Sequence, residues 1–370
     1  MTRLAEQHDA VNLSQGLPDF DTPSAIEAAA IRAIKGGHNQ YSFTWGSPAL
    51  RRGISEKARE FNGIESDPDR NVTVTCGSTE AMTASVLALA EQGDEVAFFE
   101  PAYENYVPST ILSGAAPKPI QLGPGFRLDE EALKAGLSKK TKLLIVNTPH
   151  NPSGAVLGEE ELKTIADLCE DFNITAVTDE IYEHILYDGR RHVSLATLGN
   201  MADRTVTISG ISKTYAATGW RVGYAIAEEA LTSAVRKVHD YLTVCAPAPF
   251  QEAAAFALKQ PQLYYDKLAK TYQKKRDFMA ECLRDLGFSF STPQGAYYIL
   301  ADFGGLSRLD DTHFASAMVT EGKVAAVPGS SFYLDGRRGR GQVRFSYCKK
   351  DSTLHDAARR LSVWVGSLRS

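Results

Sequence analysis

The chain has 370 residues, with 43% hydrophobic and 23% charged residues and a formal net charge of −5 at pH 7. This length and composition are those of a globular protein with one large domain or two ordinary ones. The negative net charge argues against nucleic acid as the main partner, because binding to a phosphate backbone needs a basic surface.

The cysteines, the N-terminus and the hydropathy pattern together predict a cytoplasmic protein. The 5 cysteines are scattered along the chain, which is typical of reduced thiols and not of a disulfide framework. The first residues lack the apolar core of a signal peptide, and no apolar run approaches the length of a membrane span. No zinc-type Cys/His spacing occurs, so no metal site is predicted.

Short apolar runs alternate with helical patterns between residues 71 and 227. We expect buried strands at residues 72–75, 95–99, 142–146, 174–177, 205–209 and 222–227, and helices between them at 80–91 and 159–171. Continuous apolar strands separated by helices predict an α/β fold with a mostly parallel central sheet and helices on both faces. In such sheets, ligands bind beyond the carboxyl ends of the strands.

Beyond Pro249 the pattern changes to a long helix, short β-like runs and a final helix. The helices are expected at residues 262–286 and 352–368, and the β-like runs around 297–300, 324–327 and 343–347. We therefore expect a large domain of residues 36–274 and a small α+β domain made of residues 1–35 and 275–370.

Polar residues follow several of the predicted strands. Ser78 and Thr79 come after the first strand and open a helix, where backbone N–H groups and hydroxyls can bind an anion; a plain helix cap is the alternative. Tyr103 follows the second strand, where its ring can stack on a flat ligand or simply pack in the core. Asn151 lies in a turn-forming run after the third strand. Asp179 follows the fourth, and a buried carboxylate there requires a partner.

The segment from Ser212 to Tyr224 is the most informative. Lys213 follows a strand among small residues, and a lysine in partly apolar surroundings can lose its proton and attack a carbonyl. Arg221 can hold a phosphate as a rigid fork. Together they predict a pocket for pyridoxal phosphate, an aldehyde that carries a phosphate. In the second unit, Arg344 lies between apolar residues of a β-like run, and an inward-pointing arginine there suits a substrate carboxylate.

These segments, in this order, resemble the motifs of the fold-type I pyridoxal-phosphate aminotransferases of class I/II. The resemblance covers nearly the whole chain and is closest to the kynurenine/glutamine/methionine/aromatic branch. It implies that Lys213 carries pyridoxal phosphate, that Asp179 pairs with the ring nitrogen, and that Tyr103 stacks on the ring. Asn151 and Tyr182 then contact the phenolic oxygen of the cofactor.

The resemblance also implies the remaining site residues. Ser78, Thr79, Ser212 and Arg221 would bind the phosphate, while Gly16, Asn151 and Arg344 would bind the substrate. Tyr41 would reach the cofactor phosphate of the neighbouring subunit, which predicts a homodimer with shared active sites. One departure is Gly210, which replaces a hydroxyl residue of many members and puts the cofactor affinity in doubt.

The predicted activity is transfer of the amino group of an L-amino acid, aromatic or large and neutral, to a 2-oxo acid by a ping-pong mechanism. Lys213, Asp179 and Tyr182 are the predicted catalytic residues. The apolar side-chain pocket is expected to involve Leu17, Tyr106, Tyr297 and Phe332.

Two alternatives stay open at the level of sequence. A pyridoxal-phosphate-dependent C–S β-lyase acting on cysteine derivatives would use the same residues. A ligand-binding or regulatory module would keep the fold and lose the catalysis.

Overall fold

The predicted buried strands form a central seven-stranded sheet in the computed structural model, which describes residues 1–368. The strand order is β2-β8-β7-β6-β5-β3-β4. In this sheet β8 runs antiparallel to both of its neighbours, and the other pairs are parallel. The strands are β2 (Val72–Thr75), β3 (Glu95–Glu100), β4 (Ala116–Gln121), β5 (Thr141–Asn147), β6 (Thr175–Asp179), β7 (Thr205–Gly210) and β8 (Gly223–Ile226). The mostly parallel α/β fold is thus confirmed.

The sequence did not predict strand β4, which reads Ala-Pro-Lys-Pro-Ile-Gln. Proline cannot donate a hydrogen bond and is found in edge strands. Among the described residues, β4 occupies the edge of the sheet and has β3 as its single neighbour.

Helices cover both faces of the sheet because alternate strand residues point to opposite sides. On one face, Leu143 and Ile145 share a core with α4 (Ser78–Leu89). On the other face, Leu144 and Val146 pack with α6 (Glu130–Gly136) and α7 (Glu159–Asp171). Helices α5 (Tyr106–Ser113) and α8 (Glu229–Thr243) pack against α4.

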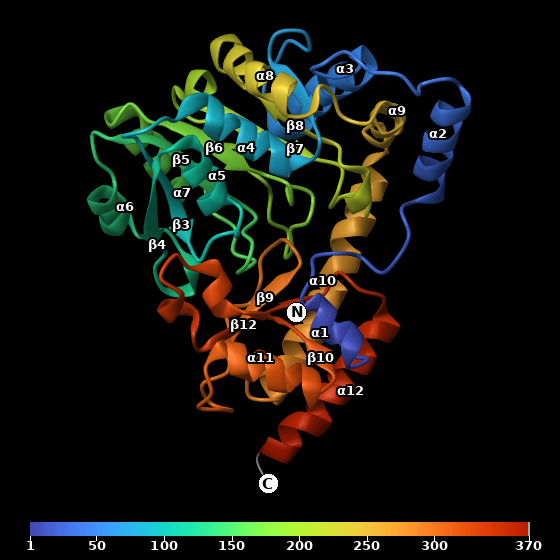
Figure 1. Cartoon of the computed structure of the whole chain (residues 1–370), viewed down its shortest axis with the longest axis vertical. Helices are drawn as coiled ribbons and strands as arrows, with labels where there is room; N and C mark the ends of the chain where they lie inside the picture. Colours follow the sequence, from blue (N-terminus) through green and yellow to red (C-terminus); the bar gives the residue numbers. More distant parts are fainter. Residues whose placement is uncertain (369–370) are drawn as a thin grey trace.

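A smaller α+β unit lies below the larger one in Figure 1, with the N-terminal helix beside it. Its antiparallel sheet has the order β11-β12-β9, and a parallel pair joins β1 to β10. The strands are β1 (Val11–Asn12), β9 (Tyr298–Asp302), β10 (Val324–Ala325), β11 (Val327–Pro328) and β12 (Gln342–Ser346). The helices of this unit are α1 (Thr2–Gln7), α11 (Asp311–Thr320) and α12 (Asp351–Leu368).

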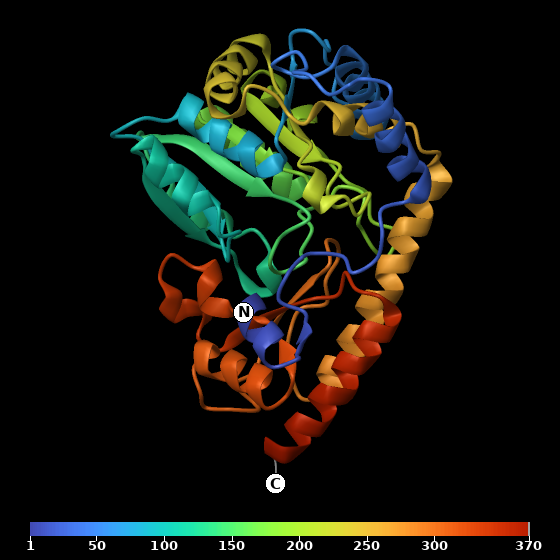
Figure 2. The ribbon, with the colours of Figure 1, turned by 45° about the vertical axis from the view of Figure 1, so that its right-hand side comes forward.

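One long helix, α10 (Gln262–Asp285), connects the two units. Figure 2 shows it running along one side of the molecule, with α12 beside its lower half. Helices α2 (Ser24–Lys35) and α3 (Pro48–Lys57) both pack against α9 (Ala248–Ala257). Short 3-10 or π turns lie at Ala58–Asn62, Pro124–Phe126, Leu195–Thr197, Met201–Arg204, Thr218–Trp220, Gly329–Phe332 and Gly336–Gly339. Within residues 1–368, no helix combines the length and apolar character that crossing a membrane requires.

Candidate active site

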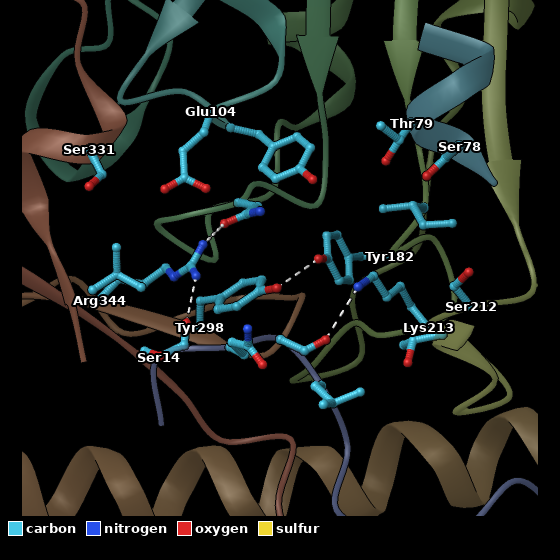
Figure 3. Close-up of a pocket in the computed structure, with 18 of the residues that line it drawn as sticks. Ser14, Ser78, Thr79, Glu104, Tyr182, Ser212, Lys213, Tyr298, Ser331 and Arg344 are labelled. Atoms are coloured by element: carbon cyan, nitrogen blue, oxygen red, sulfur yellow. Dashed lines mark hydrogen bonds between the residues drawn. The ribbon is translucent and has the colours of Figure 1, made fainter. Parts of the chain in front are cut away.

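A cavity of about 730 Å³ is lined by residues of both units. Its walls include the carboxyl end of β6, the segment after β7, the N-terminal segment around Gly16 and strand β12. All but one of the site residues that the family resemblance implies line this cavity, and several are drawn in Figure 3. They are Gly16, Ser78, Thr79, Tyr103, Asn151, Asp179, Tyr182, Ser212, Lys213, Arg221 and Arg344.

Lys213 lies in the turn segment after β7, and its side chain lies in the cavity (Figure 3). Its Nζ donates to the backbone oxygen of Gly16 at 3.3 Å. Burial lowers the pKa of the ammonium from 10.5 to about 8, and the positive charges of Arg221 and Arg344 act in the same direction. A larger fraction of the amine is therefore neutral near physiological pH, as a nucleophile or a general base requires.

Asp179 is the last residue of β6, and burial raises the pKa of its carboxyl group above the ordinary value. The Tyr106 hydroxyl opposes this shift by donating to Asp179 Oδ2 at 2.8 Å, a bond that favours the ionised carboxylate. The sequence prediction had placed Tyr106 in the substrate pocket. In the structure it is a buried partner of Asp179 and does not line the cavity.

The loop before α4 and the end of the 3-10 turn at 218–220 form a close-fitting cradle. Gly77 has φ +84°, and a Cβ atom there would lie 2.3 Å from Arg221 Nη2. A Cβ at Gly223 would lie 2.4 Å from the backbone nitrogen of Ser78. The two glycines therefore let the Arg221 guanidinium and the N-terminus of α4 converge, an arrangement that suits a phosphate group.

The same geometry explains Gly210. A Cβ at this position would lie 2.9 Å from the Val222 carbonyl oxygen, so a side chain there would force the strands to shift. Ser212 lines the cavity and supplies a hydroxyl close to Lys213.

Arg344 is 5% exposed and projects from β12. Its Nη1 donates to Asn151 Oδ1 at 2.8 Å and its Nη2 to the Ser14 carbonyl at 2.9 Å. Among the described residues its buried Nε has no hydrogen-bond partner. The central carbon of the guanidinium lies 4.4 Å from the ring centroid of Tyr298 and 4.7 Å from that of Phe332. A buried cation held without a carboxylate is ready to bind an anion.

The two predicted tyrosines of the cavity have aromatic neighbours. Tyr182 and Tyr298 place their hydroxyl oxygens 3.0 Å apart. Tyr103 packs edge-on against Tyr106, with ring centroids 5.7 Å apart. Tyr106 is therefore a buried side chain that contacts both the ring of Tyr103 and the carboxylate of Asp179.

Among the site residues that the family resemblance implies, Tyr41 does not line the cavity of its own chain. It is 83% exposed on the loop between α2 and α3. Of the residues expected in an apolar substrate pocket, Leu17 lines the cavity, while Tyr106, Tyr297 and Phe332 do not. Phe332 instead packs on Arg344, and the Tyr297 hydroxyl donates to the Gly16 carbonyl at 3.0 Å. A sequence pattern cannot distinguish lining residues from residues one layer behind them.

A buried polar network fixes the segment that follows Asp179. Glu183 pairs with Lys57 Nζ at 2.5 Å and accepts from Ser209 at 2.6 Å. Glu180 accepts from Ser194 and lies 2.6 Å from the Nε2 of His192. Burial alone would raise the pKa of Glu183, but the Lys57 ammonium and nearby groups lower it to about 2. No local sequence pattern indicates this network, because its members come from distant segments.

Comparisons with known proteins agree with this geometry. The family model for aminotransferases of class I and II matches residues 8–361. A probable N-succinyldiaminopimelate aminotransferase of Mycobacterium tuberculosis is 41% identical, over 98% of this chain and 94% of the relative. The methionine aminotransferase of Escherichia coli is 38% identical, again over 98% and 94%. The solved structure of the N-succinyldiaminopimelate aminotransferase from Mycobacterium tuberculosis superposes with a TM-score of 0.96 at 41% identity, covering 98% of this chain and 96% of that one.

The fold and the lysine–carboxylate cavity define a transferase that uses pyridoxal phosphate. The chain belongs to the class I and II aminotransferases. The glycine cradle beside Arg221, the partly neutral Lys213 and the unpaired Arg344 Nε all fit the cofactor and an amino acid substrate. The predicted family, enzyme class and cofactor are thus confirmed, whereas the role of each residue stays a prediction.

Proposed function

We propose that the cavity holds pyridoxal phosphate between Lys213 and Asp179, and that the amino donor is an aromatic or large neutral L-amino acid. The observation that carries this proposal is the position of the two side chains. Asp179 ends β6, Lys213 lies in the segment that follows the neighbouring parallel strand β7, and both side chains line the cavity that Arg344 enters.

Each side chain has a defined task in this proposal. When bound, the cofactor withdraws electrons from the substrate α-carbon. The Lys213 amine would remove the proton from that carbon and return it to the carbonyl-derived carbon on the other side of the linking nitrogen, while Asp179 would keep a proton on the ring nitrogen. Tyr182 and Asn151 donate to the phenolic oxygen, and Arg344 orients the substrate carboxylate. Tyr103 stacks on the ring, and Ser78, Thr79, Ser212 and Arg221 hold the phosphate.

The charges in the cavity support a neutral substrate side chain. Among the described lining residues, Lys213, Arg221 and Arg344 are the only lysine and arginine side chains. The proposal uses all three for the cofactor and the α-carboxylate, so no further lysine or arginine of the described lining is left for a second carboxylate. Glu104 points its carboxylate into the cavity (Figure 3) and would repel one. Leu17 and Val327 add apolar surface.

The test is the Lys213→Ala variant, assayed with a panel of amino acids and 2-oxo acids. We expect loss of the visible absorbance of the bound cofactor and loss of turnover with every pair. In the wild-type enzyme, methionine or phenylalanine should have a higher kcat/KM than aspartate. Full activity of the variant would refute the role of Lys213, and a preference for aspartate would refute the substrate class.

We infer that the active unit is a homodimer. Large apolar side chains are exposed on α2, on the loop that follows it and at the end of α8. This loop contacts α8, because the Thr44 carbonyl lies 2.7 Å from His239 Nε2. The exposed apolar residues of these three segments are Ile31, Ile34, Tyr41, Phe43, Tyr241, Leu242 and Val244. Exposed apolar patches of this kind mark an interface with a partner.

In such a dimer Tyr41 would reach the partner's cofactor phosphate. Light scattering of the wild-type protein should give twice the mass of the chain. The Tyr41→Phe variant should remain dimeric and bind the cofactor more weakly. A monomeric mass, or unchanged cofactor affinity in the variant, would contradict this inference.

The domain division and the location remain inferences as well. The packing of α2 on α9 supports placing residues 24–35 with the larger unit, so that residues 1–23 and 275–370 make the smaller one. All 5 cysteines are free, which is consistent with a reducing cytoplasm.

A further inference from the structure

Tyr298, the first residue of β9, lies between the two halves of the candidate site. Figure 3 shows it between Arg344 on one side and Tyr182 on the other. Its strand pairs with β12, where Arg344 lies opposite Leu300. Residues 298 and 300 point to the same face of the strand, so Tyr298 and Arg344 are diagonal neighbours on that face.

The ring and the hydroxyl of Tyr298 make separate contacts. The ring lies under the Arg344 guanidinium, with the central carbon 4.4 Å from the ring centroid. The hydroxyl oxygen lies 3.0 Å from that of Tyr182, which belongs to the larger unit. Both side chains are fully buried, and burial raises the pKa of Tyr298 to about 12. The hydroxyl is therefore a neutral hydrogen-bonding group at physiological pH.

The N-terminal segment closes over the same hydroxyl. A Cβ atom at Gly16 would lie 1.9 Å from the Tyr298 oxygen, so only glycine lets this segment pass. Lys213 Nζ and the Tyr297 hydroxyl both donate to the Gly16 carbonyl. The Tyr298 hydroxyl is thus enclosed by the larger unit, the smaller unit and the N-terminal segment.

We propose that Tyr298 is a positioning residue that holds Tyr182 through its hydroxyl and Arg344 through its ring. The proposal rests on the function proposed above, in which Tyr182 donates to the phenolic oxygen of the cofactor. The oxygen of Tyr182 is then free to accept from Tyr298, and a hydroxyl that accepts a hydrogen bond becomes a better donor. One side chain would thereby set the geometry at both the cofactor and the substrate carboxylate.

The hydroxyl contact is tested with the Tyr298→Phe holoenzyme, which keeps the ring and loses the hydroxyl. The proton on the nitrogen that links Lys213 to the cofactor is shared with the phenolic oxygen, and its loss changes the visible absorbance. Weaker donation by Tyr182 leaves this proton more tightly held. We expect the pH midpoint of the absorbance change to rise by a few tenths to about one pH unit. The KM for the amino donor should change less than about twofold.

The ring contact is tested with Tyr298→Leu, which removes both contacts. Its pH midpoint should rise as in Tyr298→Phe, and its KM for the amino donor should also rise by about 3- to 30-fold. Tyr272→Phe is the matched control, because Tyr272 is a buried tyrosine of the same aromatic cluster whose hydroxyl has no partner among the described residues.

A double-mutant cycle separates positioning from a general loss of packing. In a Tyr182→Phe background, adding Tyr298→Phe should not move the pH midpoint further. An equal shift in both backgrounds would overturn the proposal. So would a Tyr298→Phe midpoint equal to that of the control, or equal KM values in the Phe and Leu variants. A wild-type protein that shows no visible band with pyridoxal phosphate would refute the proposed function instead.

Discussion

At the scale of the residue, burial controls the protonation of Lys213. Because desolvation lowers its pKa from 10.5 to about 8, the neutral amine dominates above pH 8 and not only above 10.5. The rate at which the apoenzyme forms its covalent bond to pyridoxal phosphate should therefore rise with pH and level off just above 8. Stopped-flow absorbance across the pH range measures this rate. A rate that kept rising towards pH 10 would show an ordinary solvated lysine.

Single residues also mark the limit of what the sequence predicted. Lys213, Asp179 and Arg344 could be found because their motifs require those residue types. The contacts of Tyr106 and Tyr298 could not be predicted, because they depend on which side of a helix end or a strand end faces the cavity. A tyrosine in an apolar run has the same pattern whether it lines a site or supports one.

At the scale of the element, the loop before α4 depends on Gly77. Gly77→Ala would combine a positive φ with a clash against the Arg221 guanidinium. We expect it to weaken pyridoxal phosphate binding by about tenfold or more, since displacing Arg221 removes a charge-assisted contact to the phosphate. Titration of the apoenzyme with the cofactor measures the change.

Gly93→Ala is the control for this experiment. Gly93 also has a positive φ of +102°, but nothing lies within 4 Å of the added Cβ. It should lose stability through backbone strain and keep its cofactor affinity. Equal affinities for the two variants would contradict the cradle around Arg221.

The ion pair between Lys57, at the end of α3, and Glu183, after β6, makes the free energy of unfolding depend on pH. Glu183 has its pKa lowered from 4.5 to about 2, so its contribution is present above pH 4.5 and is lost as the pH falls through 2. This contribution amounts to about 3 kcal/mol. The Glu183→Gln variant lacks it and should be less stable than the wild type at pH 7.

Urea unfolding at several pH values checks this prediction. The difference in the free energy of unfolding between wild type and Glu183→Gln should shrink as the pH falls from 4.5 towards 2. A difference that stays constant over this range would show that Glu183 does not titrate with folding.

At the scale of the whole molecule, the sequence predicted the sheet because its buried strands are continuous apolar runs between amphipathic helices. It missed β4, whose two prolines are tolerated only at the edge it occupies. It also could not show that α2 packs with the larger unit, because that contact depends on α9, more than 200 residues further along the chain. Long-range packing of this kind leaves no local pattern.

The central claim is that Lys213 and Asp179 meet one bound cofactor in the shared cavity. Reduction of the holoenzyme with borohydride fixes pyridoxal phosphate on the lysine that carries it, and peptide mass mapping then identifies that lysine. We predict a single modified peptide that contains Lys213, and a fall in the yield of that peptide in Asp179→Ala as the cofactor binds more weakly. Modification of a different lysine, or none, would contradict the account.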